Sequence, residues 1–246
     1  VENGAARGIE LRGGERTRAD AVISNADFRR TFLELIPPAV LPASFRTAVE
    51  QLRPTASALC VHLGLDIVPT CNPVLHFRHS GRDMGIVMPS LVDPSAAPQS
   101  YSTMELTRLL PPEEAEGWFR GDDVAAREIW RRSGAYRALK ALAAEEMIDL
   151  ASMAFPGLRN HLIYKSAASP VTFARYDWSS QGAIYGCEKQ SLVKGAKGPV
   201  AGLYLAGAGN FGPGIEAVVI AGARAAEAIL PGILARPNDA GTSLAA

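Results

Sequence analysis

The sequence predicts a mixed α/β protein of the α+β kind, and three observations carry this prediction. The segment 56–66 alternates apolar residues with small or polar ones, which is the period of a β-strand. The segment 135–154 repeats apolar residues every three or four positions, as an amphipathic helix does. A strand-like run over 203–206 enters a glycine-rich loop and then a helix of small residues over 215–230.

The amino-terminal segment predicts a β-hairpin. Residues 7–11 and 17–24 flank a turn over 12–15 that contains a glycine pair, and glycine supplies the positive φ that a tight turn needs. The second half of this hairpin contains the run Ala21-Val22-Ile23, so we expect that strand to be well buried.

Two short helices are expected after the hairpin. Asn25 and Asp27 are candidate caps for a helix over 28–36, because their side-chain oxygens can accept from the first free N–H groups. The following Pro37-Pro38 pair ends that helix, and a second helix is expected to open at Pro42.

The middle of the chain predicts an antiparallel sheet with a helix packed on it. Weaker strand patterns, separated by proline and glycine turns, occur over 74–78, 85–88 and 100–108, and a later strand is expected over 161–166. The helix over 135–154 ends at Pro156-Gly157 and should pack one face against this sheet. We expect a solvated helix start over 111–116 and a turn over 169–172.

The composition is that of a folded globular protein without a charge bias. Of the 246 residues, 48% are hydrophobic, and 25 basic side chains balance 25 acidic ones. A net charge of zero gives no electrostatic argument for nucleic acid as a partner. The longest apolar stretch, 217–230, is interrupted by Arg224 and Glu227 and is shorter than the roughly 20 residues of a membrane-spanning helix.

The cysteines and histidines do not suggest a metal site. Cys60, Cys71 and Cys187 are far apart and have no CxxC spacing, so we expect neither a disulfide framework nor a zinc site, and a cytoplasmic location fits. The four histidines are scattered, and we expect structural or solvent-exposed roles for them.

The segment 207–212, Gly-Ala-Gly-Asn-Phe-Gly, matches GxGxxG between a strand and a helix. A dinucleotide-binding Rossmann unit also needs a second parallel strand after the helix and an acidic residue about 20 positions on. Here Pro231-Gly232 ends the helix and no strand pattern follows, so we expect the match to be false. What remains is a helix amino terminus whose free N–H groups favour an electron-rich ligand, or else a tightly packed structural turn.

Three segments, in this order, resemble the phytoene desaturase-like FAD oxidoreductases, a group of carotenoid desaturases, carotenoid isomerases and retinol saturase-like enzymes. They are 19–27 (ADAVISNAD), 169–176 with 182–186 (SPVTFARY and GAIYG), and 203–226 (LYLAGAGNFGPGIEAVVIAGARAA). The resemblance covers nearly the whole chain. It implies the carboxyl-terminal half of a two-domain, FAD/NAD(P)-binding Rossmann-like flavoenzyme with an antiparallel substrate-domain sheet plus helices.

The resemblance also implies a division into domains. Residues 1–30 and 187–232 would contribute to the FAD-binding domain, 31–186 would form the substrate-binding domain, and 233–246 would be a loose tail. Members of the group open with a Rossmann GxGxxG unit, which this chain does not contain. The chain begins at Val1, so we expect a processed product or the second part of a longer protein. The implied partner is an amino-terminal half that carries the Rossmann unit, as a separate subunit or a cleaved chain.

The site residues that the resemblance implies fall into two sets. Gly207, Ala208, Gly209 and Asn210 would line the ribityl and pyrophosphate end of FAD, Gly214 and Ile215 would face N1 and the C2 carbonyl of the flavin, and Ser24 and Asn25 would join this cofactor site. The candidates on the substrate side are Tyr176, Trp178 and Tyr185. The sequence does not identify the catalytic residues, and no metal ligand is expected.

The implied reaction is hydride transfer from a carbon–carbon bond to the flavin N5, on an apolar substrate. Near the flavin-facing segments the sequence offers only Arg175 and Asp177 to anchor a small polar acid. Two alternatives stay open: an amine oxidase-like flavin oxidase, and a non-catalytic subunit or lipid-binding module that keeps the fold. Peripheral contact with a membrane also stays open.

Overall fold

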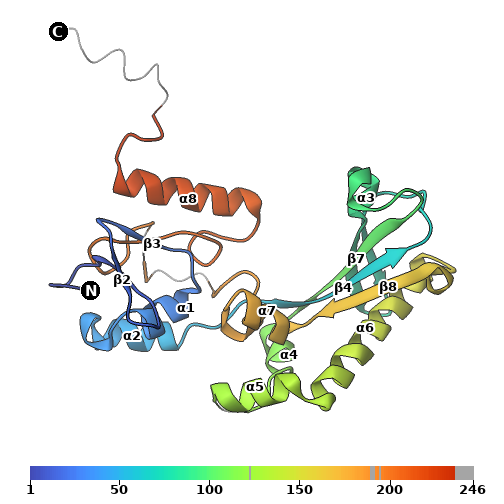
Figure 1. Ribbon diagram of the computed structural model, residues 1–246, viewed down its shortest axis with the longest axis horizontal. Coiled ribbons are helices and arrows are strands. Elements are labelled where there is room, and N and C mark those ends of the chain that lie inside the picture. The colour runs from blue at the N-terminus through green and yellow to red at the C-terminus, as the bar shows by residue number, and fades with distance from the viewer. Residues whose placement is uncertain (122, 189–191, 194, 236–246) are drawn as a thin grey trace, which may run out of the picture. The chain divides into compact units, whose positions relative to one another are not determined.

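The structure, a computed structural model, describes residues 1–121, 123–188, 192–193 and 195–235 (Figure 1). The chain divides into two compact units. Unit 1 joins the two ends of the chain, Val1–Thr55 and Tyr185–Ala246, and unit 2 is the intervening segment Ala56–Ile184. The tail expected over 233–246 lies outside the described residues from position 236 onward.

The first boundary differs from the expected one. Unit 1 continues to Thr55, whereas the contribution to the FAD-binding domain was predicted to end at residue 30. The reason is packing, because Phe32 and Val49 are buried in the same hydrophobic cluster as Leu203 and Leu205. The segment 31–55 therefore folds with the strands of unit 1. At the other boundary the unit begins at Tyr185, two residues before the expected position.

Unit 1 contains strands β1 (Gly8–Glu10), β2 (Arg16–Arg18), β3 (Val22–Ser24) and β9 (Leu203–Leu205), helices α1 (Phe28–Arg30), α2 (Ala43–Glu50) and α8 (Ile215–Ile229), and the short helical segments η1 (Thr31–Leu35) and η2 (Pro38–Val40). The predicted hairpin is confirmed as β1 and β2. The prediction of one buried strand over 17–24 is wrong. Every residue of β2 is exposed, and β3 is a separate strand that pairs in parallel with β9.

The local signals for the first helices are confirmed. Asp27 caps α1 by accepting from the backbone N–H of Arg30 at 3.0 Å, and the helix continues as a π-helical turn to Leu35. Arg29 reaches from α1 to the end of α2, where one guanidinium nitrogen donates to the carbonyls of Val49, Glu50 and Leu52 at 2.6–3.0 Å. Val49 and Glu50 lie in the last turn of α2, where carbonyls lack the usual partner four residues on, and Leu52 follows the helix.

Unit 2 contains strands β4 (Ser57–Leu65), β5 (Val74–His79), β6 (Arg82–Val87), β7 (Ser102–Leu110) and β8 (Leu162–Ala168), helices α3 (Pro89–Val92), α4 (Pro112–Glu116), α5 (Val124–Arg132), α6 (Gly134–Ala154) and α7 (Pro170–Tyr176), and the 3-10 turns η3 (Pro94–Ala96), η4 (Leu158–His161) and η5 (Ser180–Gly182). The strands form one antiparallel sheet in the order β5-β6-β7-β4-β8, which confirms the predicted sheet.

The core of unit 2 lies between this sheet and α6, which runs along one face of it (Figure 1). Met147 and Ile148 of α6 are buried against Leu63 of β4 and Leu106 of β7. On the opposite face of β4, Cys60 is buried as well, and α7 packs against this strand.

Helix α7 replaces the turn that was expected over 169–172. Ser169 accepts from the backbone of the first turn, the Thr172 side chain accepts from the Ser169 N–H, and Pro170 occupies the first helical position. A serine before proline with a polar residue three positions on is the arrangement of a helix start. The turn prediction is therefore wrong. In the part of the chain that the structure describes, no helix is long and apolar enough to cross a membrane.

Candidate functional site

The predicted glycine loop is a closed turn at the end of β9. The backbone N–H groups of Asn210 and Phe211 both donate to the carbonyl of Gly207, at 3.2 and 3.3 Å. The Asn210 side chain donates to the carbonyl of Leu205 at 3.1 Å, which ties the loop back to its strand. The main chain therefore fixes Gly207, Ala208, Gly209 and Asn210 as one rigid turn.

Strand β3 brings Ser24 and Asn25 beside this loop. Ser24 is paired with Leu205, and its carbonyl accepts from the N–H of Ala206 at 3.0 Å. Its hydroxyl lies 2.8 Å from that of the buried Thr31. Gly207 has a φ of +84°, and a β-carbon there would lie 1.8 Å from the Oδ1 of Asn25. Six of the eight predicted cofactor residues thus gather at the ends of two parallel strands.

A second glycine contact supports the loop. A β-carbon on Gly186, whose φ is +76°, would lie 2.6 Å from the α-carbon of Gly209. The carbonyl of Gly186 accepts from both the N–H and the hydroxyl of Thr55, each at 2.8 Å. The family resemblance includes residues 182–186 but implies no role for Gly186. The glycine itself was the only indication of a close contact, because the neighbouring residues do not show which main chain would lie against it.

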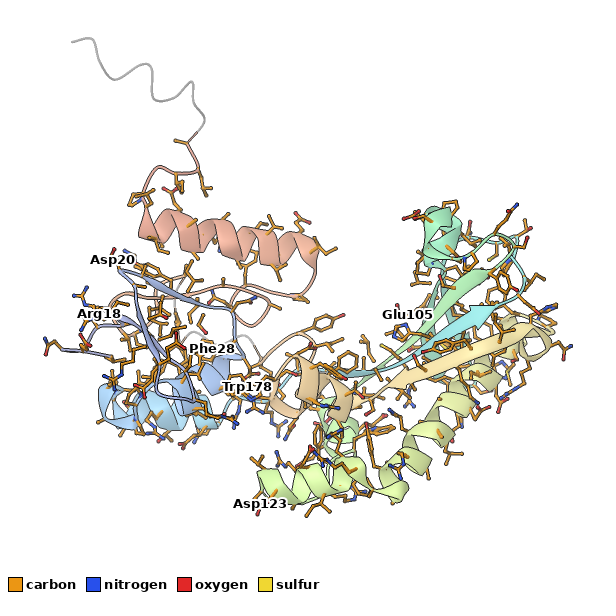
Figure 2. The ribbon with its side chains drawn as sticks, in the orientation of Figure 1. Arg18, Asp20, Phe28, Glu105, Asp123 and Trp178 are labelled. Atoms are coloured by element: carbon orange, nitrogen blue, oxygen red, sulfur yellow. The ribbon has the colours of Figure 1, made fainter. Side chains whose placement is uncertain are left out.

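A cavity of about 190 Å³ opens beside the loop. It is lined by Phe28, Leu52, Cys187, Glu188, Val193, Gly209, Asn210 and Phe211; Phe28 is labelled in Figure 2. Burial raises the pKa of the Cys187 thiol to about 12, and the nearby Asp27 carboxylate adds to this effect. The thiol is therefore neutral at ordinary pH and does not act as a thiolate nucleophile.

Helix α8 begins with an open end. Its N-cap residue is Gly214, with a φ of +96°, and no side chain caps the first turn. In the described part of the chain, no atom lies within 4 Å of a β-carbon position on Gly214, and Ile215 is 85% exposed. The free N–H groups and the positive end of the helix dipole favour a negatively charged or electron-rich group here.

Small residues and one arginine hold α8 in place. Ala221 and Ala225 are fully buried in unit 1, and the guanidinium of Arg224 stacks over the ring of Phe211 at 4.2 Å from its centre. Among the described residues, nothing lies within 4 Å of a β-carbon position on Gly222, so this glycine is not where α8 approaches another backbone.

The substrate-side candidates are divided between the units. Tyr185 belongs to unit 1, whereas Tyr176 and Trp178 belong to unit 2. Tyr176 is 73% exposed and stacks with Arg175, whose guanidinium carbon lies 5.1 Å from the ring centre. Trp178, labelled in Figure 2, has a left-handed backbone with a φ of +52°, which is uncommon for a residue other than glycine.

The described residues contain no group of histidine, cysteine and acidic side chains that could hold a metal ion. His62 lies 3.7 Å from Glu105 of β7, which Figure 2 labels, and His161 lies 2.9 Å from Asp66. The three cysteines are free.

The parallel strand pair ends in a glycine turn and an uncapped helix, and the antiparallel sheet is covered by helices, so the chain has a mixed α/β fold. The model of the flavin-containing amine oxidoreductase family matches residues 2–230, so the chain belongs to this family. Relatives that match nearly the whole chain include proteins named prolycopene isomerase and 4,4'-diapolycopene oxygenase.

Two relatives and one solved structure illustrate the similarity. The chain is 28% identical to the chloroplastic prolycopene isomerase of Daucus carota, over 93% of this chain and 38% of the relative. It is 24% identical to a 4,4'-diapolycopene oxygenase of Methylomonas, over 90% of this chain and 46% of the relative. An oxidoreductase from Methanosarcina mazei shares the fold, with a TM-score of 0.56 and 20% identity; the match covers 90% of this chain and 46% of that protein. The chain thus spans less than half the length of these proteins.

Proposed function

We propose that this chain forms the carboxyl-terminal part of an FAD-dependent dehydrogenase or desaturase that acts on an apolar substrate. The observation that carries the proposal is the open amino terminus of α8 beside the closed glycine turn 207–211. FAD, when bound, would supply hydride acceptance at its N5 atom, with the hydride taken from a carbon–carbon bond of the substrate. The residues of this chain bind and orient the cofactor.

The residues present fit a flavin. Gly214 leaves open space where a side chain would stand, and the uncapped N–H groups of α8 can stabilise the negative charge that a reduced flavin carries at N1 and the C2 carbonyl. Gly207 to Asn210 form a turn that a ribityl or pyrophosphate group can approach. Ser24 and Asn25 border the same turn and complete this wall of the site.

The second part of the proposal is a partner that carries the Rossmann unit. Unit 1 leaves large apolar side chains exposed on β3 and α8, namely Ile23 at 52%, Ile215 at 85% and Val219 at 64%. The relatives are more than twice as long as this chain. We propose that an amino-terminal half carrying the Rossmann unit covers this surface. The partner is either a separate subunit or the other part of a cleaved chain.

The third part concerns the substrate. We propose an apolar substrate that reaches the flavin past Tyr185, with Tyr176 and Trp178 on the substrate side. Two relatives are named for prolycopene and 4,4'-diapolycopene, and these names support this choice. The free cysteines support a cytoplasmic location, and peripheral contact with a membrane would give access to an apolar substrate.

The experiment compares two variants in the native assembly that contains this chain. Gly214→Val should abolish flavin absorbance, because a branched side chain would fill the space at the helix start. Gly13→Val, in open space in the turn between β1 and β2, should leave flavin occupancy unchanged. Equal flavin occupancy in both variants would show that the loop is merely structural.

Further measurements separate the alternatives. The chain by itself should not bind FAD tightly, and stoichiometric binding would remove the need for a partner. An assembly without flavin absorbance would favour a non-catalytic subunit. Reduction of the flavin by amines, and never by isoprenoid or acyl compounds, would favour the amine oxidase-like alternative, which the description of the family also supports.

A further inference from the structure

Unit 2 contains a second cavity, of about 360 Å³, between the sheet, α4 and α6. Its floor is apolar: Leu59 of β4, Leu110 of β7, and Met147 and Leu150 of α6 are all at most 6% exposed. The indole of Trp118 and the side chains of Leu139, Leu142 and Ala143 complete the apolar wall. This volume falls within the roughly 300–1,000 Å³ that small-molecule sites occupy.

Arginines stand in this cavity at positions where the strand pattern calls for apolar residues. Arg82 follows the period of Met84 and Ile86 in β6, and these two side chains face α6 in the core. Arg108 likewise follows the period of Met104 and Leu106 in β7. Side chains alternate between the faces of a strand, so both arginines lie on the helix-covered face of the sheet. Both line the cavity.

The charged side chains that line this cavity do not cancel one another. Arg82, Arg108 and Arg120 line the cavity together with Glu114 and Glu146. Arg108 donates to Glu114 at 2.8 Å, and Arg120 donates to the carbonyls of Gly117 and Phe119. Among the described residues no carboxylate forms an ion pair with Arg82. An anionic group would therefore find one unpaired guanidinium and a second whose partner it could displace.

We propose that this cavity binds an anionic amphiphile, with an apolar chain among the leucines and a carboxylate or phosphate head at Arg82 and Arg108. The apolar floor favours burial of the ligand's alkyl chain, and the two arginines form charge-assisted hydrogen bonds with its anionic head group. The site is separate from the glycine turn of unit 1, and the proposal does not depend on flavin chemistry. A fatty carboxylate of moderate length is the simplest ligand of this class.

Binding to the full 246-residue chain can be measured by calorimetry, with dodecanoate as the ligand and dodecanol as the neutral comparison. Dodecanoate should bind about tenfold more tightly than dodecanol, as expected for hydrogen bonds to a charged group. Arg82→Gln and Arg108→Gln should each remove about this advantage. Glu114→Gln should strengthen dodecanoate binding, because it releases Arg108. Arg16→Gln, an exposed arginine of the β2 strand, is the matched control and should change nothing.

The position of the ligand's alkyl chain in the cavity can be tested independently. Ala143→Phe should block both ligands by filling the cavity, whereas Ala138→Phe, on the exposed side of α6, should not. A brominated dodecanoate should quench the fluorescence of Trp118, and the quenching should disappear in Trp118→Phe while calorimetric binding persists. Equal affinity for dodecanoate and dodecanol, or undiminished binding to Ala143→Phe, would overturn the proposal. Inorganic phosphate alone, which lacks the chain, should not compete; competition at equal concentration would also contradict it.

Discussion

Gly186 and Gly209 meet backbone against backbone: a β-carbon on Gly186 would lie 2.6 Å from the α-carbon of Gly209. Real side chains do not reach such a distance, and the atom that they would strike belongs to the main chain. The two residues come from distant parts of the sequence, yet both border the predicted flavin site. Their contact sets the distance between the glycine turn 207–211 and the segment around Gly186.

The first prediction compares alanine at these two positions. Gly186→Ala should destabilise unit 1 by about 2 kcal/mol or more, because it combines a left-handed φ of +76° with a main-chain clash. Gly209→Ala should cost less than about 1 kcal/mol, since its nearest neighbour would be the β-carbon of Phe28 at 3.9 Å. Urea unfolding of both variants measures the difference. Similar losses in the two would contradict the contact.

The second prediction concerns Gly207 and Asn25. Gly207→Ala should cost about 1–3 kcal/mol, from the positive φ and from the Asn25 Oδ1 at 1.8 Å from the new β-carbon. The Asn25→Ala change removes the amide that the new β-carbon would strike. Adding it to Gly207→Ala should therefore recover the part of the stability loss that comes from this clash and leave the part that comes from the positive φ. A double-mutant cycle on the free energy of unfolding gives the coupling. Strict additivity of the two changes would show that the residues do not touch.

The third prediction is a pH dependence. The folded-state pKa of Cys187 is about 12, against 9.0 in the unfolded chain, so the native state keeps a proton that the unfolded state releases. This favours the unfolded state as pH rises between 9.0 and about 12. Stability in that window should fall more steeply in the wild type than in Cys187→Ala. Iodoacetamide at pH 9 should modify Cys187 only after denaturant is added. Rapid alkylation of the native thiol would contradict the predicted burial.

The fourth prediction uses two buried serines of unit 2. The Ser179 hydroxyl, in a residue 7% exposed, has no hydrogen-bond partner in the described part of the chain. The fully buried Ser57 donates to the carbonyl of Gly182 at 2.6 Å. Ser179→Ala should therefore leave stability unchanged or raise it by about 1 kcal/mol, and Ser57→Ala should lower it by about 1 kcal/mol or more. Thermal unfolding distinguishes the two signs; equal destabilisation by both would count against this assignment.

The sequence by itself determined the elements that local chemistry specifies. The apolar periods of 56–66 and 135–154 predicted β4 and α6, and the cap at Asp27 predicted the start of α1. The strand, glycine loop and helix over 203–230 were also readable, because side-chain period, glycine content and helix stops act over a few neighbouring residues. Together with the family resemblance, these local signals predicted that the chain is part of a flavoprotein.

Only the tertiary structure decided what depends on distant partners. Strand β3 continued the hairpin in the sequence pattern, but in the fold it leaves β2 and pairs with β9 from the other end of unit 1. That pairing places Asn25 against Gly207, and the entry of the chain into unit 1 places Gly186 against Gly209. The arginines of the second cavity became significant only when α6 covered their face of the sheet. A contact between remote segments depends on how the whole chain packs, and no local pattern encodes it.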